Sequence, residues 1–90
     1  MSSQNRPFAN IQREVKIDSI LNLEDFSLPE GFFMRAEGAG NISYVPLLNQ
    51  DDEIITKTIT PSAYFSDPVV VRKILQDGTT ATDIYIGIGL

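Results

Sequence analysis

Apolar and polar residues alternate along the last eight positions of the chain, residues 83–90. Successive side chains of a strand point to opposite sides, so one face of this segment collects Ile84, Ile86, Ile88 and Leu90. The opposite face collects Tyr85, Gly87 and Gly89. The pattern predicts a C-terminal strand whose isoleucine face belongs to the core. Residues 69–76 are rich in β-branched side chains and predict a strand directly before it.

Asp77-Gly78 lies between these two segments and predicts a turn, so we expect the two strands to pair as a hairpin. With a two-residue turn, Val71 lies opposite Ile84. With a longer loop that extends to Thr82, Leu75 lies opposite Ile84. The register stays open, whereas the hairpin is expected in both cases.

A second hairpin is predicted upstream, because residues 32–37 and 42–48 flank the sequence Gly38-Ala-Gly-Asn41. Glycine and asparagine tolerate positive φ, and we expect Gly38, Gly40 and Asn41 to be structural turn residues, as are Asp77 and Gly78. Pro46 has no backbone N–H group. It therefore predicts a sheet edge or a bulge in the second strand of this hairpin.

The remaining segments give shorter signals. Residues 49–52 predict a turn, and residues 53–60 predict a strand whose threonine face, made of Thr56, Thr58 and Thr60, is in contact with water. Residues 17–26 have near-helical spacing, but Pro29 and Gly31 follow so soon that we expect one helical turn at most. Residues 61–68 form a predicted loop in which Tyr64 and Phe65 either pack on the core or dock on another surface.

Taken together, the patterns predict one all-β domain over residues 17–90, a small antiparallel β-sandwich or barrel of about six strands. Residues 1–16 carry a net charge of +2, which leaves −7 for residues 17–90. We expect residues 1–16 to be an extended N-terminal arm, either a solvated terminus or a segment that docks on a neighbouring subunit. The predicted interface residues are Arg6, Phe8, Arg13, Tyr64, Phe65 and Tyr85.

Composition narrows the chemistry. The 90 residues include no histidine and no cysteine, which removes the usual general base, the imidazole metal ligand and thiolate chemistry. The net charge of −5 speaks against nucleic-acid binding. Asp51-Asp52-Glu53 lacks the ligand spacing of an EF-hand, so we expect a plain turn there. We expect no enzymatic activity, no cofactor and no metal.

The chain also has neither a long apolar run nor the apolar region of a signal peptide. We therefore expect a soluble protein that is made in the cytoplasm of its host without export or membrane insertion.

Several motifs resemble those of a known family. In chain order they are Ala36-Glu-Gly-Ala-Gly-Asn-Ile-Ser-Tyr44, Val69-Val-Val-Arg-Lys-Ile74 and Gly78-Thr-Thr-Ala-Thr82. In this order and over about residues 18–88 the chain resembles the small spike-base, or head-decoration, proteins of tailed phages and gene transfer agents. The final motif is the most distinctive. One departure is Ser62-Ala63-Tyr64, where the family usually has Pro-Ala-Gly.

The resemblance implies a non-enzymatic structural protein of the virion, a head spike base or capsid decoration located at the capsid surface. It implies a homo-oligomer whose further partner is the major capsid protein or a spike fibre. A neck or tail component is a related possibility. A different interpretation is a carbohydrate-binding module of a host-recognition fibre, with Tyr44, Tyr64, Phe65 or Tyr85 as stacking platforms, although the chain has no tryptophan.

Overall fold

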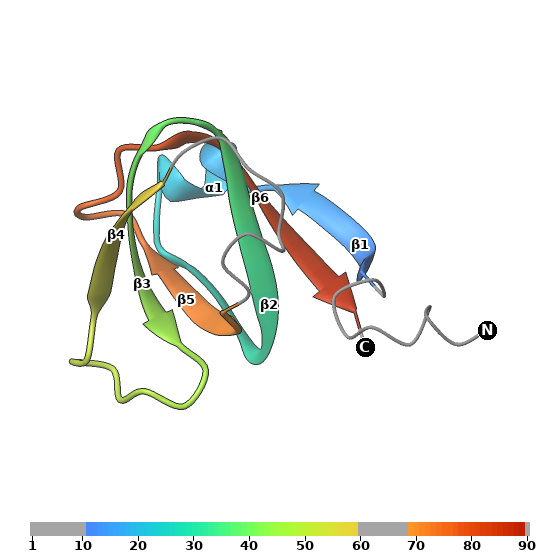
Figure 1. Ribbon diagram of the computed structural model, residues 1–90, viewed down its shortest axis with the longest axis vertical. Coiled ribbons are helices and arrows are strands. Elements are labelled where there is room, and N and C mark those ends of the chain that lie inside the picture. Colours follow the sequence, from blue (N-terminus) through green and yellow to red (C-terminus); the bar gives the residue numbers. More distant parts are fainter. Residues whose placement is uncertain (1–10, 60–68, 90) are drawn as a thin grey trace.

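The computed structural model describes residues 11–59 and 69–89 (Figure 1). The fold is all-β, as predicted, and consists of a six-stranded antiparallel sheet in the order β1-β6-β2-β5-β3-β4. Within the described residues its only helix is a single turn, which agrees with the expectation for residues 17–26. The elements are β1 (Ile11–Lys16), α1 (Asp18–Leu21), β2 (Phe26–Gly38), β3 (Gly40–Pro46), β4 (Ile55–Ile59), β5 (Val71–Leu75) and β6 (Thr82–Gly89).

The long strand β2 connects the two halves of the sheet. Its first half, from Phe26 to Phe32, pairs with β5, and its second half, from Phe33 to Gly38, pairs with β6. Gly31 lies near the end of the first half with φ +93°, and a Cβ there would lie 2.8 Å from a methyl group of Val70. A residue with a side chain would be strained at this bend. The bend allows the sheet to fold over and enclose a sandwich-like core.

The core draws on both halves of the sheet and on the start of α1. The largest fully buried side chains are Tyr44, Phe32, Ile17, Ile42, Ile74, Ile84, Ile86, Val45 and Val71. Burial of a large apolar side chain contributes about 1.5–3 kcal/mol. The predicted isoleucine face of the last strand is confirmed for Ile84 and Ile86, which are buried, and Ile88 packs against the same cluster. Leu90 lies outside the described residues.

The predicted hairpin between the last two strands is wrong. β5 pairs with β2 and β3, while β6 pairs with β1 and β2, so β2 separates them (Figure 1). Val71 lies opposite Phe32 and Ile84 lies opposite Ala36, so neither of the two open registers applies. Both strands are apolar and central, and each satisfies its backbone groups on two sides instead of one.

The predicted hairpin between residues 32–37 and 42–48 is also wrong, because β5 lies between β2 and β3. The hairpin that the structure contains is the next one along the chain, β3–β4, in which Tyr44 lies opposite Ile55. β3 is an interior strand, so the sheet edge expected at Pro46 is wrong. The register does shift between Val45 and Pro46, but the extra residue is Arg72 on β5. Thr56 and Thr58 are exposed, as predicted, and Thr60 lies outside the described residues.

The first strand of the sheet begins earlier in the sequence than expected. Residues 11–16, which were expected to belong to the N-terminal arm, form β1 and pair with β6 along its length. Val15 lies opposite Ile86 and adds to the apolar layer. Residues 1–10 lie outside the described part of the chain.

Candidate functional site

Two sequence motifs, residues 36–44 and residues 78–82, meet at one end of the sandwich. We call this contact the corner and define it as residues 38–41 and 79–82. The carbonyl oxygen of Asn41 accepts hydrogen bonds from the backbone N–H groups of Thr80 at 2.8 Å and Ala81 at 3.0 Å. The N–H of Asn41 donates to Thr80 Oγ1 at 2.9 Å, and the N–H of Ser43 donates to Thr79 Oγ1 at 3.0 Å. These hydrogen bonds join two connecting segments that are about forty residues apart in sequence.

The residues predicted as turn residues lie at or beside this contact, but they redirect the chain from one half of the sheet to the other instead of closing hairpins. Gly40 has φ +152°, and a Cβ there would lie 2.6 Å from the backbone nitrogen of Ala81. Gly38 ends β2 opposite Thr82. Asp77 and Gly78 form a turn that the N–H of Thr79 closes on the carbonyl of Gln76 at 3.4 Å.

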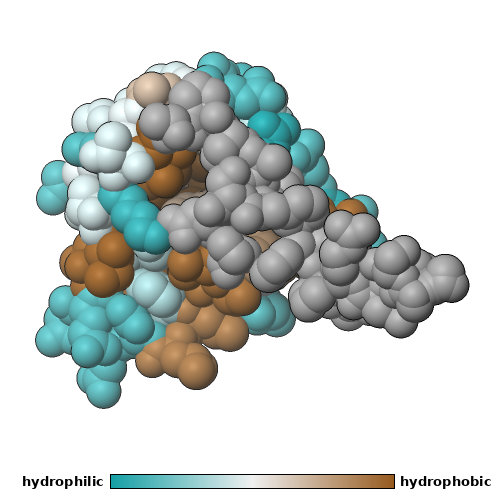
Figure 2. All heavy atoms as spheres, viewed as in Figure 1, coloured by the Kyte–Doolittle hydropathy of each residue, from teal (hydrophilic) through white to brown (hydrophobic). Residues whose placement is uncertain are grey.

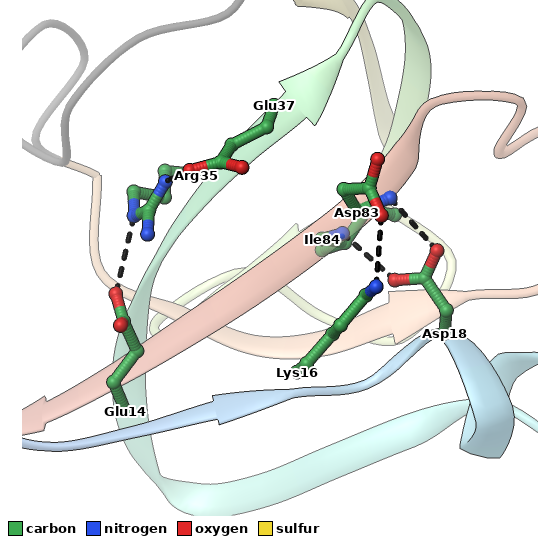
Figure 3. Close-up of polar contacts among 7 residues, drawn as sticks. All are labelled: Glu14, Lys16, Asp18, Arg35, Glu37, Asp83 and Ile84. Carbon is green, nitrogen blue, oxygen red and sulfur yellow. Dashed lines mark hydrogen bonds and ion pairs between the residues drawn. The ribbon is translucent and has the colours of Figure 1, made fainter.

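A carboxylate clamp holds the start of β6 (Figure 3). Asp18 accepts hydrogen bonds from the backbone N–H of Asp83 at 2.8 Å and of Ile84 at 2.7 Å. Asp83 has φ +53°, a conformation that aspartate adopts more readily than most residues. Lys16 Nζ lies 2.8 Å from Asp83 Oδ1. The hydrogen bond and the charge of Asp83 raise the pKa of Lys16 above its usual value of 10.5.

Beside this clamp lies a polar pocket of about 310 Å³. Its lining comprises Asp18, Leu21, Asn22, Gln76, Thr79, Thr80, Ala81, Thr82 and Ile84. Asp18, Thr79 and Thr80 already accept the backbone hydrogen bonds described above. These three side chains of the pocket therefore stabilise the fold through their hydrogen bonds to the backbone.

Arg35 organises the outer face of β6 and β2 (Figure 3). Its guanidinium lies 3.1 Å from a carboxylate oxygen of Glu14 and 2.9 Å from one of Glu37. The same group lies 4.4 Å from the ring centroid of Tyr85, within the range of a cation–π contact. Tyr85 is partly buried, and Arg35 occupies one face of its ring.

The structure separates the predicted interface residues that it describes. Arg13 is exposed on β1 opposite Ile88, so it lies on the inner side of the sheet, whereas Tyr85 lies on the outer side with Arg35. Arg6, Phe8, Tyr64 and Phe65 lie outside the described residues. Tyr44, one of the expected stacking platforms for sugars, is only 2% exposed. That role is wrong for Tyr44 because its ring is part of the core.

The β3–β4 hairpin presents an apolar surface that sequence reasoning missed. We call residues 46–55 the tip. Leu48 is 94% exposed, Ile54 48% and Ile55 38%, and the acidic run Asp51-Asp52-Glu53 lies between them in sequence. Figure 2 shows apolar atoms on both sides of a hydrophilic turn at the lower left of the molecule, below the β3 and β4 of Figure 1. The sequence feature that could have indicated this surface is Leu48, a leucine directly before the predicted turn at residues 49–52.

The backbone of the tip is firmly held. The N–H of Glu53 donates to the carbonyl of Gln50 at 2.9 Å, which confirms the predicted turn, and Asn49 Nδ2 donates to the carbonyl of Glu53 at 3.1 Å. Arg72, on β5, donates to the carbonyl of Asn49 and lies 2.7 Å from Asp51 Oδ1. The hydrogen bond and the charge of Arg72 lower the pKa of Asp51 below its usual value.

A second apolar surface lies at the other end of the sheet, between β1 and the first half of β2. We call it the groove; its volume is about 230 Å³. It is lined by Arg13, Val15, Ile20, Phe26, Leu28, Ile86 and Ile88. Apart from Arg13 the lining is entirely apolar. The groove is thus an open side of the core with one cation at its margin.

Within residues 11–59 and 69–89, no three acidic, histidine or cysteine side chains lie close enough to hold a metal ion. The same residues contain no helix of the length and apolar character needed to cross a membrane. In comparisons with known proteins, no family model, no curated protein and no solved structure matches this chain.

Proposed function

We propose that this chain is a non-enzymatic structural protein of a phage-like virion, a head spike base or capsid decoration that assembles with copies of itself and docks on the capsid. One observation carries the proposal. The distinctive motif at residues 78–82 and the glycine-containing motif at residues 36–44 are far apart in sequence and bond to each other at the corner. This contact supports the proposal because the two motifs form one structural unit.

The surface of the molecule supports the same proposal. Apolar side chains are exposed at the tip, and an apolar groove opens at the other end of the sheet. A small building block needs such surfaces to bury apolar area between copies or against a larger scaffold. The partners that we propose are further copies of this chain, the major capsid protein and a spike fibre.

The proposal is tested by following the chain into particles. A tagged chain is produced in a host that makes the particles, which are then purified by gradient sedimentation and imaged by cryo-electron microscopy. We expect the chain to sediment with the heads and to contribute density on a symmetry axis of the capsid. Particles that assemble fully with the chain left in the particle-free fraction would contradict the proposal.

A matched pair of variants makes this result specific. Gly40→Val breaks the corner, and we expect it to be absent from particles. Ala39→Val changes an exposed neighbouring residue, and we expect it to be incorporated as the wild type is. Equal incorporation of both variants would mean that the folded domain is not what the particle binds.

A further inference from the structure

We propose that copies of this chain join head to tail, with the tip of one copy docked in the groove of the next. The inference rests on the proposed function as a self-assembling protein and names the two surfaces that would carry it. It commits to a second copy of the chain as the occupant of the groove.

The tip is suited to docking because its conformation is fixed before contact. Its carbonyl and amide groups are engaged by Gln50, Glu53 and the guanidinium of Arg72. Leu48 is nevertheless 94% exposed. A rigid segment that presents an apolar side chain loses little conformational entropy on binding, so most of the favourable desolvation contributes to affinity.

The groove offers an apolar counterpart of suitable size. Its volume of about 230 Å³ is more than one leucine side chain occupies, so Leu48 can enter it. Its walls are the side chains of Val15, Phe26 and Leu28 together with the isoleucines of β6 and α1. Contact would remove apolar surface from water on both partners.

Charge favours the same pairing. Asp52 is exposed at the tip, and Arg13 is exposed at the margin of the groove. In the described part of the chain neither residue takes part in an ion pair, whereas Asp51 is paired with Arg72 and Glu14 with Arg35. An acidic turn approaching a basic margin favours this orientation of the two copies.

The positions of the two surfaces determine the type of assembly. The tip belongs to β3–β4 at one end of the strand order and the groove to β1, β6 and β2 near the other end (Figure 1). Because the two surfaces do not overlap, each copy can use both at once. Contacts of this heterologous kind close into a ring or extend into a filament.

The first experiment compares two exposed leucines. Leu48→Asp places a charge on the tip, and Leu23→Asp places the same charge at a leucine that is 84% exposed after α1. By native mass spectrometry and light scattering at high micromolar concentration, we expect Leu48→Asp to weaken association by at least about tenfold, as for an interface hot spot, and Leu23→Asp to leave it unchanged. Equal association of the two variants would overturn the inference.

The second experiment exchanges the charges. Arg13→Glu and Asp52→Arg should each associate poorly alone, because like charges then face each other across the contact. An equimolar mixture of the two variants should recover association in alternating order, and the double variant should recover it by itself. Mixtures that remain as dispersed as the single variants would overturn the pairing of tip and groove.

The outcomes separate this inference from the proposed function. A wild type that assembles on particles while Leu48→Asp and Arg13→Glu do so equally well leaves the function standing and rejects the tip–groove contact. A wild type that stays monomeric in solution and absent from particles rejects both. Circular dichroism of every variant establishes that the domain is folded, so that loss of association is not loss of structure.

Discussion

The corner and the tip are both held by hydrogen bonds to the backbone, but they differ in what they cover: the corner buries Ala81, whereas the tip exposes Leu48. At the corner, Ala81 is 7% exposed and neighbouring Ser43 is 3% exposed, because two links of the chain lie against each other. At the tip, Leu48 is 94% exposed although the backbone there is also hydrogen-bonded. The comparison indicates that the corner determines the fold, whereas the tip is a fixed element left available for contact.

The largest expected effect is at the corner. Gly40→Val should lower the free energy of unfolding by at least about 3 kcal/mol, because it forces a β-branched residue into positive φ and places Cβ against the backbone of Ala81. Urea denaturation followed by circular dichroism measures this. Ala39→Val is the control and should change the free energy by less than about 0.5 kcal/mol. Equal free energies of unfolding for the two variants would contradict the close contact between residues 38–41 and 79–82.

The clamp at the start of β6 should give the next largest effect. Asp18→Ala removes the acceptor for the N–H groups of Asp83 and Ile84, and we expect a loss of about 2–3 kcal/mol in the free energy of unfolding. Asp18→Asn retains one acceptor oxygen and should lose less. Asp52→Ala, at the exposed tip, serves as the negative control. Equal losses for the three variants would argue against the clamp.

Within the corner, burial should separate two similar threonines. Thr79→Val removes the acceptor of the N–H of buried Ser43 and should cost about 1–2 kcal/mol. Thr80→Val removes the acceptor of the N–H of Asn41, but that bond is exposed and water can replace it. We expect Thr80→Val to cost less than Thr79→Val in the same denaturation experiment. A larger loss for Thr80→Val than for Thr79→Val would contradict the packing of residues 79–82 against residues 38–41.

Acidification should affect the tip through Asp51. The hydrogen bond and the charge of Arg72 lower the pKa of Asp51 in the folded state, so the unfolded state binds a proton more readily. The stabilisation is present above the ordinary value of 3.8 and is lost as the pH falls through the lowered pKa. The stability difference between wild type and Asp51→Asn should shrink over this range. A difference that does not change with pH would contradict the ion pair.

The smallest effect on stability is expected at Leu48. Because its side chain is almost fully exposed, Leu48→Ala should change the free energy of unfolding by less than about 0.5 kcal/mol when measured at low protein concentration. Association at high concentration should fall. A large loss of stability at low concentration would place Leu48 in the core of its own chain and would remove the distinction between corner and tip.

The elements could be predicted from the sequence better than their pairing. The alternation of Ile84 and Ile86 is a local property, and it identified β6 and its buried face correctly. Pairing was mispredicted because Asp77-Gly78 and Gly38–Asn41 are residues that turn a chain, and turn residues do not reveal whether the next strand is a neighbour or a crossover. The path of the chain is decided instead by the hydrogen bonds of Asn41 with Thr80 and Ala81, which join segments that are distant in sequence.

The candidate surfaces were harder to predict for a related reason. β1 was missed because, as an edge strand, it exposes Gln12, Arg13 and Glu14 and so resembles a polar arm. The interface role of Tyr85 stays a prediction. Its contact with Arg35, which reaches the ring from the neighbouring strand β2, could not be predicted because only the register shows it. Exposure of Leu48 depends on how the chain leaves the sheet after the register shift at Pro46, which composition does not specify.

Nuclear magnetic resonance of the labelled protein tests the central claim, the joining of two distant motifs at the corner, most directly. Scalar couplings across hydrogen bonds should connect the N–H groups of Thr80 and Ala81 to the carbonyl of Asn41. Cross-strand nuclear Overhauser effects should connect Met34 with Ile86. Missing couplings, together with cross-strand effects between Val71 and Ile84, would instead indicate a terminal hairpin and contradict this account of the fold.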